Sequence, residues 1–412
     1  MAIDPEELKR RRQQRAEARA RQKAQQRKML IKLAIAVAVL ILCGILIFAI
    51  AASADKAKKK AAAEAMQGPQ TRTIRLAATG DLNVTGRLVT SQSGSVDYDA
   101  MFMDVAHLLA DADITVMNLE GVACGEPYGD SKSVPQVLLK TLDMAGVDFV
   151  QLANSYAIHK GVYGLATTMD AVRAAGMEPL GVYKDAQERK TGGGFTLCEV
   201  QGIKIALVAF TKGMNGMALP AGSEACVNLL YTDYSSLYQE VDVEGITKVM
   251  DAVAKEKPDI TIAMVHWGSE NNDELSASQQ QIEALLLEKG TDAIIGTHPH
   301  RVQKIDYRSD TKQLVAYSLG DFVSGFEQAG SEYSVILNLE ITKNLVTGEA
   351  WIAGYDYTPI FTVNEEGKQV KVVRIKETMA AFESGYIEKV SAETYASMKN
   401  ALERISARIQ GE

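Results

Sequence analysis

Cysteine and histidine are both scarce in this chain, which has four cysteines and five histidines in 412 residues. Cys43 falls within a long apolar run, so Cys124, Cys198 and Cys226 can form one disulfide at most. That number is too small for a scaffold held together by disulfides. No two cysteines have the spacing of a zinc-binding pair, which argues against a metal site built from thiolates.

Basic residues are also scarce once the first 32 residues are set aside. Those residues contain eleven Lys or Arg and four Asp or Glu, whereas the whole chain has a net charge of −8, so the remainder is distinctly acidic. A nucleic-acid-binding surface needs a basic face to neutralise phosphates. We therefore predict no nucleic-acid partner for the main part of the chain. The basic leader could be an RNA-binding arm, but a solvated segment beside anionic lipid is the simpler interpretation.

Charge is absent from a nearly continuous apolar run of twenty residues, 33–52, and the next charged residue is Asp55. At about 1.5 Å per helical residue the run spans roughly 30 Å, the thickness of a hydrocarbon core. A buried helix of a soluble core would show a polar face, so we predict an uncleaved transmembrane helix. The alternative is a cleaved signal peptide, because Ala52-Ser53-Ala54 has the small-x-small form of a cleavage site.

The flanking charges predict how this helix is oriented. Eleven basic residues precede it, and a smaller cluster follows it, consisting of Lys56, Lys58, Lys59 and Lys60. Positive charge is preferentially retained in the cytoplasm. We therefore expect a single-pass protein of the cell membrane with a cytoplasmic N-terminus and an extracytoplasmic main domain.

Composition and pattern divide the chain into five parts. We expect a basic cytoplasmic tail at 1–32, the transmembrane helix at 33–52, an Ala-, Lys- and Gln-rich stalk at 53–72, a folded domain at 73–385 and a C-terminal helix at 386–412. The stalk has no aromatic residue with which to build a core.

The folded domain begins with alternating strands and helices. Apolar runs predict strands at 73–79, 114–118, 149–152, 178–180, 194–200, 204–210, 260–266 and 293–295, and helices at 98–109, 134–145, 164–175, 243–256 and 276–289. This alternation predicts an α/β domain. The last third instead predicts consecutive antiparallel strands at 302–307, 314–318, 333–342, 350–358 and 370–375, then a helix at 392–409. Together these elements predict two facing sheets with helices outside.

Three of the five histidines follow directly on predicted strands. His266 ends one strand, and His298 and His300 follow another, separated by a proline. Open α/β sheets bind ligands at the carboxyl ends of their strands, and a His-x-His pair can direct two imidazoles at one metal ion. The alternative is a chance clustering of scarce histidines. His107 falls within an apolar helical pattern and is assigned to packing or to the surface.

Two acidic residues also stand just after predicted strands. Asp81 follows the first strand through Gly80, and Glu120 follows the second. A glycine before an acid lets the backbone turn sharply and brings the carboxylate to the sheet edge. Either acid alone is more often a helix N-cap. Together with the histidines, however, they predict a site for one or two divalent ions, Mn, Fe or Zn, that polarise an ester and activate water.

These residues lie in motifs that follow one another in a fixed order. The motifs are Leu-Ala-Ala-Thr-Gly80-Asp81, Met117-Asn118-Leu119-Glu120, Phe210-Thr211-Lys212-Gly213-Met214-Asn215-Gly216, His266-Trp267-Gly268-Ser269-Glu270, Gly296-Thr297-His298-Pro299-His300 with Gln303, and Tyr317-Ser318-Leu319-Gly320-Asp321-Phe322. Over about 73–325 the chain resembles the CapA family of poly-γ-glutamate capsule proteins. The resemblance implies the four-layer α/β/β/α fold of metallo-dependent phosphatases. It also implies a role in synthesis or export of poly-γ-glutamate at the cell surface.

The resemblance also assigns residues by position. It implies metal-facing side chains at Asp81, Glu120, His266, His298 and His300, with Glu270, Asn215 and Asp321 binding substrate or supporting the site. Asp321 stands where the family usually has asparagine, and its extra negative charge could compensate for a lost ligand.

One family motif is altered in this chain. CapA proteins usually have Asn-Asn-His after the third strand, and in the wider phosphatase fold the asparagine binds metal and the histidine stabilises the leaving oxygen. This chain has Asn154-Ser155-Tyr156, with His159 three residues later. Serine is a weaker ligand, and tyrosine is a poorer proton donor at neutral pH. As substitutes we predict Asn154 as a metal ligand and Tyr156 or His159 as the catalytic group.

Two functions fit this pattern. The first is a metal-dependent hydrolase of phosphoester or related bonds at the outer face of the membrane. The second is a non-catalytic surface component that binds or routes an anionic polymer such as poly-γ-glutamate and keeps a degenerate metal site. The expected partners are the membrane, the polymer or phosphoester substrate, and other capsule-export proteins. An acidic domain binds a polyanion poorly without a metal or a basic patch, and the sequence has no clear patch of this kind.

Overall fold

The computed structural model describes residues 70–84, 86–89, 96–129, 132–325, 328–385 and 390–411. The predicted cytoplasmic tail and the predicted transmembrane helix at 33–52 lie outside these residues, as does most of the stalk. Across the part of the chain that is described, no helix has both the length and the apolar composition needed to cross a membrane.

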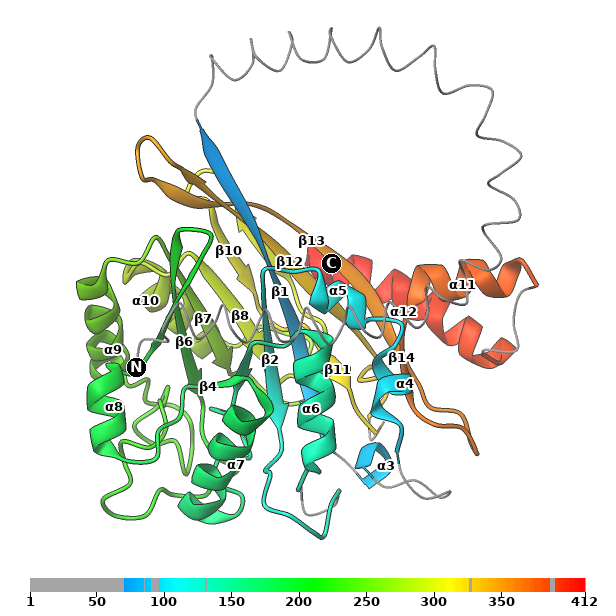
Figure 1. The fold of residues 1–412 in the computed structure, drawn as a ribbon, viewed down its shortest axis with the longest axis horizontal. Coiled ribbons are helices and arrows are strands. Elements are labelled where there is room, and N and C mark those ends of the chain that lie inside the picture. The colour runs from blue at the N-terminus through cyan, green and yellow to red at the C-terminus, as the bar shows by residue number, and fades with distance from the viewer. Residues whose placement is uncertain are drawn as a thin grey trace, which may run out of the picture.

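Two β-sheets form the centre of the fold (Figure 1). The first has eight strands in the order β14 (Lys371–Arg374), β13 (Ala350–Val363), β12 (Tyr333–Asn344), β1 (Thr71–Asn83), β2 (Ile114–Glu120), β3 (Phe149–Gln151) and β4 (Glu178–Leu180), with β11 (Asp321–Val323) also paired to β1. The second has six strands in the order β5 (Thr196–Val200), β6 (Ile203–Thr211), β7 (Ile260–His266), β8 (Ala293–Thr297), β10 (Gln313–Ala316) and β9 (Ile305–Arg308).

Strand direction follows the order of elements along the chain. Strands β1 to β4 are parallel to one another, and so are β6, β7, β8 and β10. Parallel neighbours need a crossover connection, which helices supply between β1 and β4 and between β6 and β8. Strands β12, β13 and β14 extend the first sheet in antiparallel pairing, as predicted for the last third of the chain.

The two sheets pack face to face because alternate residues of a strand point to opposite sides. In β6, Ile205, Leu207 and Ala209 belong to the core shared with the eight-stranded sheet. Ala206, Val208 and Phe210 belong to a second apolar cluster, shared with two helices. The inner strands of the six-stranded sheet are therefore covered on both faces.

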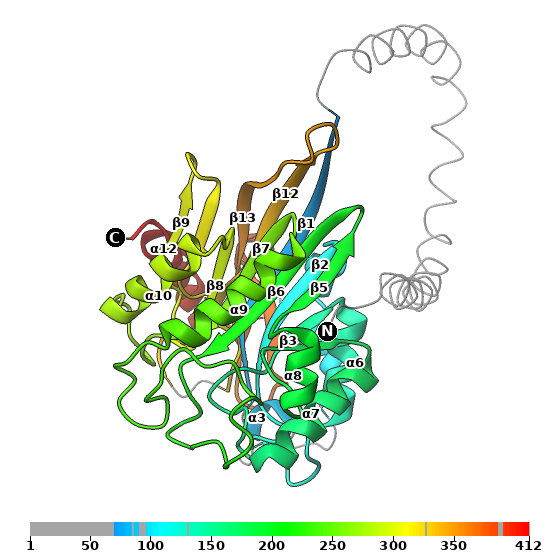
Figure 2. The same cartoon turned by 90° about the vertical axis from the view of Figure 1, so that its left-hand side faces the viewer.

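Helices close the fold on its two outer faces (Figure 2). Helices α9 (Val243–Glu256) and α10 (Ala277–Glu288) cover the six-stranded sheet, whereas α6 (Gln136–Ala145) and α7 (Gly161–Ala175) cover the eight-stranded sheet. The mixed α/β class is confirmed, and the layers follow the order α/β/β/α. The other helices are α3 (Gly86–Val89), α4 (Tyr98–Phe102), α5 (Ala106–Ala110), α8 (Ala186–Gly192), α11 (Ile375–Glu383) and α12 (Ala392–Gln410).

Several predicted boundaries were wrong for local reasons. The helix predicted at 98–109 is divided into α4 and α5 by a turn that buries Val105. The strand predicted at 194–200 begins only at Thr196, because Gly193 and Gly194 have φ angles of 70° and 89° that no extended strand allows. The helices α8 and α11 and the strand β11 were not predicted.

The fold brings the carboxyl ends of strands from both sheets to one place. The backbone N–H of His298, just after β8, donates to Asp81 Oδ2 of β1 over 3.0 Å. This hydrogen bond joins the two sheets at the edge where the sequence placed its candidate ligands. The described cysteines, Cys124, Cys198 and Cys226, form no disulfide bond.

Candidate metal centre

Asp81 is positioned by a close backbone contact rather than by the sharp turn expected from the sequence. Strand β1 continues through Gly80 to Asn83, with one extra residue relative to β2 between Ala78 and Asp81. A Cβ atom on Gly80 would lie 1.8 Å from the carbonyl oxygen of Gly320, so only glycine fits. Asp81 N–H donates to that same oxygen over 2.9 Å. The bulge therefore holds Asp81 against the start of β11.

The Asp81 carboxylate is fully buried and accepts two hydrogen bonds. Asn118 Nδ2 donates to Oδ1 over 2.6 Å, and the His298 N–H donates to Oδ2. Asn118 is the register partner of Asp81 on β2, and Asp321 is its partner on β11. Three polar residues thus lie side by side across three parallel strands.

One half of the centre contains Glu120, His266 and His298, which can share an ion because their ligand atoms lie within 4.8 Å of one another. The Glu120 carboxylate is 3.4 Å from His266 Nε2. Ser155 Oγ lies 3.0 Å from the same nitrogen and 3.5 Å from His298 Nδ1. Thr297 Oγ1 contacts the other ring nitrogen of His266 at 3.0 Å, which fixes the orientation of the ring.

The other half contains Asp81, His300 and Asp321, which form a second group of the same kind. His300 Nδ1 lies 2.7 Å from Asp321 Oδ1 and 3.5 Å from Asp81 Oδ2. His300 Nε2 lies 3.9 Å from Glu120 Oε2, so the two halves are continuous. Glu270, which is exposed, forms a third group of possible metal ligands with the buried His298 and His300.

The backbone of the His-Pro-His segment is strained. His298 and His300 have φ angles of 95° and 55°, in the left-handed region that few non-glycine residues adopt. Such conformations persist where the surrounding structure holds them, and they concentrate at functional sites. The hydrogen bond from His298 N–H to Asp81 and the pairing of His300 with Asp321 hold these two residues.

Burial displaces the pKa values of the cluster. Loss of solvent raises the pKa of Asp81 to about 6 and that of Glu120 to about 8, because the charged carboxylates lose hydration. The same loss lowers the pKa of His266 and of His298 well below the ordinary value. Burial also opposes the charge of His300, but the neighbouring carboxylates of Asp321, Glu120 and Asp81 raise its pKa well above the ordinary value. Carboxylates that burial penalises in this way gain from a bound cation.

The donor set fits a divalent metal. Two neutral imidazoles and several buried carboxylates match the nitrogen and oxygen ligands that Mn, Fe and Zn accept. Glu120 Oε1 is buried and has no hydrogen-bond partner among the described residues. A buried carboxylate oxygen that accepts no hydrogen bond is costly unless an ion or another donor satisfies it. The predicted residues Asp81, Glu120, His266, His298 and His300 therefore converge, and Asp321, assigned a supporting place, lies among them.

The segment with the altered motif supplies one side chain to the cluster. Ser155 faces His266, as its alignment with the family's ligand position implies. Asn154, predicted as a ligand, uses its amide inside the fold instead: Nδ2 donates to Asn118 Oδ1 and to Leu119 O, and Oδ1 accepts from Tyr156 N–H. Asn154 thus binds this loop to the end of β2.

The remaining predicted residues lie around the cluster. Tyr156 lines a cavity with His300 and Asp321, whereas His159 packs edge-on against the Tyr156 ring, with 5.7 Å between ring centroids. Glu270 and Asn215 are exposed and line a cavity beside His298.

Two lysines beside the cluster were not singled out from the sequence. Lys212 directly follows β6, and its Nζ donates to Gly268 O over 2.6 Å. Lys132 lies in the loop after β2, and its Nζ donates to Asn83 Oδ1 over 2.9 Å. The strand-end rule that selected the histidines also covers Lys212, which stands in a quoted motif. No comparable pattern marks Lys132.

Comparison with known proteins agrees with the motifs. The family model described as "Bacterial capsule synthesis protein PGA_cap" matches residues 75–326. The "Capsule biosynthesis protein CapA" of Bacillus anthracis is 25% identical over 258 residues, which are 61% of this chain and 59% of that protein. The "PGA biosynthesis protein CapA" of Bacillus subtilis (strain 168) is 24% identical over 295 residues, 69% of this chain and 72% of that protein. The chain thus matches less than two thirds of the length of the first of these relatives.

A solved structure, described as a novel phosphatase from Mycoplasma pneumoniae, aligns with 71% of this chain and 95% of its own, with a TM-score of 0.44 and 13% identity. That likeness is too distant to assign an activity. The family match covers more than half of the chain, however, and both CapA relatives agree with it. This chain is a member of the bacterial capsule synthesis protein family PGA_cap, and the resemblance to CapA is confirmed.

Proposed function

We propose that this chain is a metal-dependent hydrolase of a phosphoester or related bond that acts in the synthesis or export of a capsule polymer. The observation that supports the proposal best is the buried cluster of Asp81, Glu120, His266, His298 and Asp321, joined through His300 and open to cavities on two sides. Such a cluster, formed at the strand ends of an α/β/β/α sandwich, is the arrangement expected of the metallo-dependent phosphatase type.

These six side chains would hold one or two divalent ions. A bound divalent ion polarises the phosphoryl oxygens and activates water as a nucleophile. His266 and His298 are suited to bind a cation because burial keeps their rings unprotonated. Asn118 and the His298 N–H orient the Asp81 carboxylate.

Hydrolysis consumes one water and needs a proton acceptor and a proton donor. The bond between phosphorus and the leaving oxygen breaks, and the water oxygen bonds to phosphorus. Glu270, an exposed carboxylate that lines both cavities, would accept a proton from the water. Tyr156, which lines the second cavity beside His300, would donate its phenolic proton to the leaving oxygen. Proton exchange with solvent then restores both residues.

Metal analysis of the purified full chain, combined with hydrolysis of chromogenic phosphomonoesters and phosphodiesters, tests this proposal. We expect one or two equivalents of Mn, Fe or Zn per chain and turnover that chelation abolishes. Adding back the metal should restore turnover. A chain that is folded and free of metal, and that hydrolyses no ester, would contradict the proposal.

Ser155 supports a second candidate, a non-catalytic component with a degenerate metal site. Its hydroxyl contacts His266 where the family pattern has an asparagine, and a hydroxyl is the weaker ligand. The double substitution Ser155→Asn with Tyr156→His separates the two candidates. If the wild-type chain is inactive and the variant hydrolyses esters, this chain is degenerate. If the variant is no better than an active wild type, the hydrolase stands.

We also propose that residues 33–52 anchor the chain and that its main domain lies outside the cell. The proposal rests on the uncharged apolar run and on the excess of basic residues before it. After alkaline carbonate extraction the full-length chain is expected in the membrane pellet. In intact protoplasts, added protease is expected to digest the main domain. A soluble chain whose N-terminus begins near residue 55, identified by mass spectrometry, would instead establish a cleaved signal peptide.

A further inference from the structure

Two cavities open on the cluster, one beside His298 and the other beside His300. The first has a volume of about 260 Å³ and is lined by Ser155, Lys212, Asn215, Tyr238, Ser269 and His298, among others. The second has a volume of about 140 Å³ and is lined by Asn83, Lys132, Tyr156, His300, Asp321 and Ser324, among others. Glu270 lines both, so the two cavities meet at its side chain.

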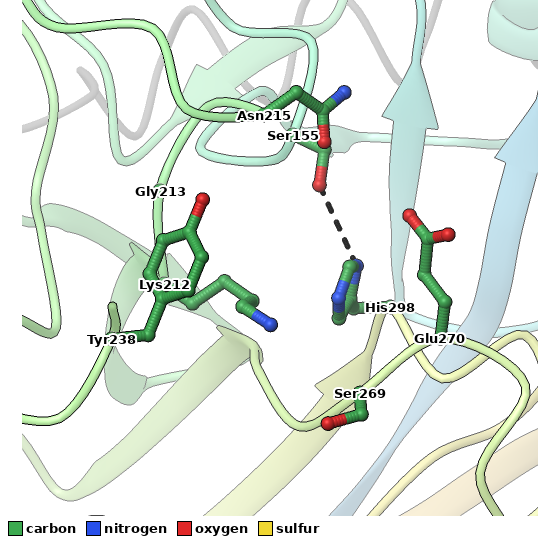
Figure 3. A pocket seen from close by; sticks show the side chains of 8 residues that line it. All are labelled: Ser155, Lys212, Gly213, Asn215, Tyr238, Ser269, Glu270 and His298. Carbon is green, nitrogen blue, oxygen red and sulfur yellow. Dashed lines mark hydrogen bonds between the residues drawn. The ribbon is translucent and has the colours of Figure 1, made fainter. Parts of the chain in front are cut away.

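The first cavity contains a lysine held over an aromatic ring. Figure 3 shows the Lys212 amino group directed into the space between Tyr238 and His298. Lys212 Nζ lies 4.7 Å from the centre of the Tyr238 ring and donates to Gly268 O. An ammonium has three N–H donors, and Gly268 O is the hydrogen-bond acceptor that the described residues offer it. Donor capacity therefore remains for a ligand in the cavity.

The second cavity repeats this arrangement. Lys132 Nζ lies 4.5 Å from the centre of the Tyr156 ring and donates to Asn83 Oδ1. Lys132 has a φ of 58°, and its backbone N–H and C=O both form hydrogen bonds with the surrounding loop. The backbone that carries the lysine side chain is therefore held in place. Cation–π contacts of this kind keep an ammonium in place while leaving it partly unhydrated. Each side of the cluster thus has one positioned cation.

The sizes of the cavities limit what each can hold. Since a water molecule occupies about 30 Å³ of liquid, the smaller cavity has room for about five waters. A carboxylate or a phosphate group fits this space. Each lysine also lies over one face of its tyrosine ring, which leaves that face less open to base stacking.

We propose that the two cavities are paired anion subsites for a linear substrate, with Lys212 and Lys132 each binding one small anionic group on opposite sides of the cluster. The substrate would cross the cluster, and the bond presented to it would be internal to the chain rather than terminal. This inference deepens the proposed function, on which the cleavage step rests, but the binding step can be measured separately.

Binding of a carboxylate oligomer to the purified full chain tests the subsites. The probe is hexa-L-aspartate, compared with aspartate and with uncharged hexa-L-asparagine by isothermal titration at constant ionic strength. We expect the hexamer to bind more tightly than the monomer and the uncharged hexamer not to bind. Lys212→Ala and Lys132→Ala should each raise the Kd for hexa-L-aspartate about tenfold, the loss typical of one charged hydrogen bond. The double variant should bind hexamer and monomer alike.

Matched variants exclude a general charge effect. Lys399→Ala removes an equal charge from an exposed site on α12 and should leave the Kd unchanged. Lys212→Arg and Lys132→Arg should retain most of the binding. Equal losses with Lys399→Ala, or no loss with either lysine variant, would overturn the proposal. Lysine-dependent binding without any ester turnover would contradict the proposed hydrolase activity but would still support the two anion subsites.

Discussion

Replacing His298 with alanine is expected to remove bound metal and to lower ester hydrolysis about a thousandfold. His298 belongs to two of the three groups that can share an ion, one with Glu120 and His266 and one with Glu270 and His300. Loss of His298 therefore removes a possible metal ligand from both groups. Electrostatic stabilisation by a metal is worth several kcal/mol of the barrier, and about 1.4 kcal/mol corresponds to tenfold in rate. Metal content by mass spectrometry and kcat/KM for the best ester substrate are the measurements.

The substitution also changes a residue whose φ is 95°, so a folding defect must be separated from a metal defect. His298→Asn is the second variant, because asparagine tolerates the left-handed region better than alanine does. It should lose metal to a similar extent while keeping the wild-type Tm under chelation. His107→Ala, at an exposed position of α5, is the matched control and should change neither property. Full activity in both His298 variants would refute the centre.

Replacing Gly80 with alanine is expected to destabilise the domain by about 3 kcal/mol or more and to abolish metal binding. The added Cβ would lie 1.8 Å from Gly320 O and 2.8 Å from Gly320 C, both backbone atoms that cannot rotate away. Relief requires β11 to separate from β1, which would break the register that pairs Asp81 with Asp321. For a domain of this size the Tm should fall by roughly 5 °C or more.

A second glycine in the same sheet provides the control for this prediction. The Cβ of an alanine at Gly354, in β13, would have Glu340 Oε2 at 4.0 Å as its nearest neighbour. Gly354→Ala should therefore change the free energy of unfolding by less than about 0.5 kcal/mol. Thermal and urea unfolding of both variants, with and without chelator, give the comparison. If Gly80→Ala behaves like Gly354→Ala, the close contact does not determine the geometry of the site.

Local patterns were enough to predict which residues converge. Asp81, Glu120 and His266 were identified because each stands at or just beyond the end of an apolar strand, and parallel strands end at one edge of a sheet. The His-Pro-His segment followed from the same rule. The α/β class was predictable for a similar reason, since the alternation of strands with amphipathic helices is visible in short windows of sequence.

Other features depended on contacts between distant segments. The continuation of β1 past Gly80 depends on Gly320, 240 residues later in the chain, and no local pattern reports such a contact. Asp321 was placed near the site by resemblance, but its membership in the cluster comes from its register opposite Asp81 in β11, a strand of three residues. Lys132 was missed because a loop with positive φ, rather than a strand end, directs its side chain.

Taken alone, the amino-acid sequence determined the alternation of elements, the uncharged segment at 33–52, the acidic character of the main domain and the side chains that stand at strand ends. These properties depend on neighbouring residues. Tertiary structure alone decided how the two sheets meet, which carboxylates share His300, and that two lysines give an acidic domain positive charge on either side of its buried cluster. Those outcomes depend on register and on backbone contacts across the fold, which are fixed only when the two sheets pack together.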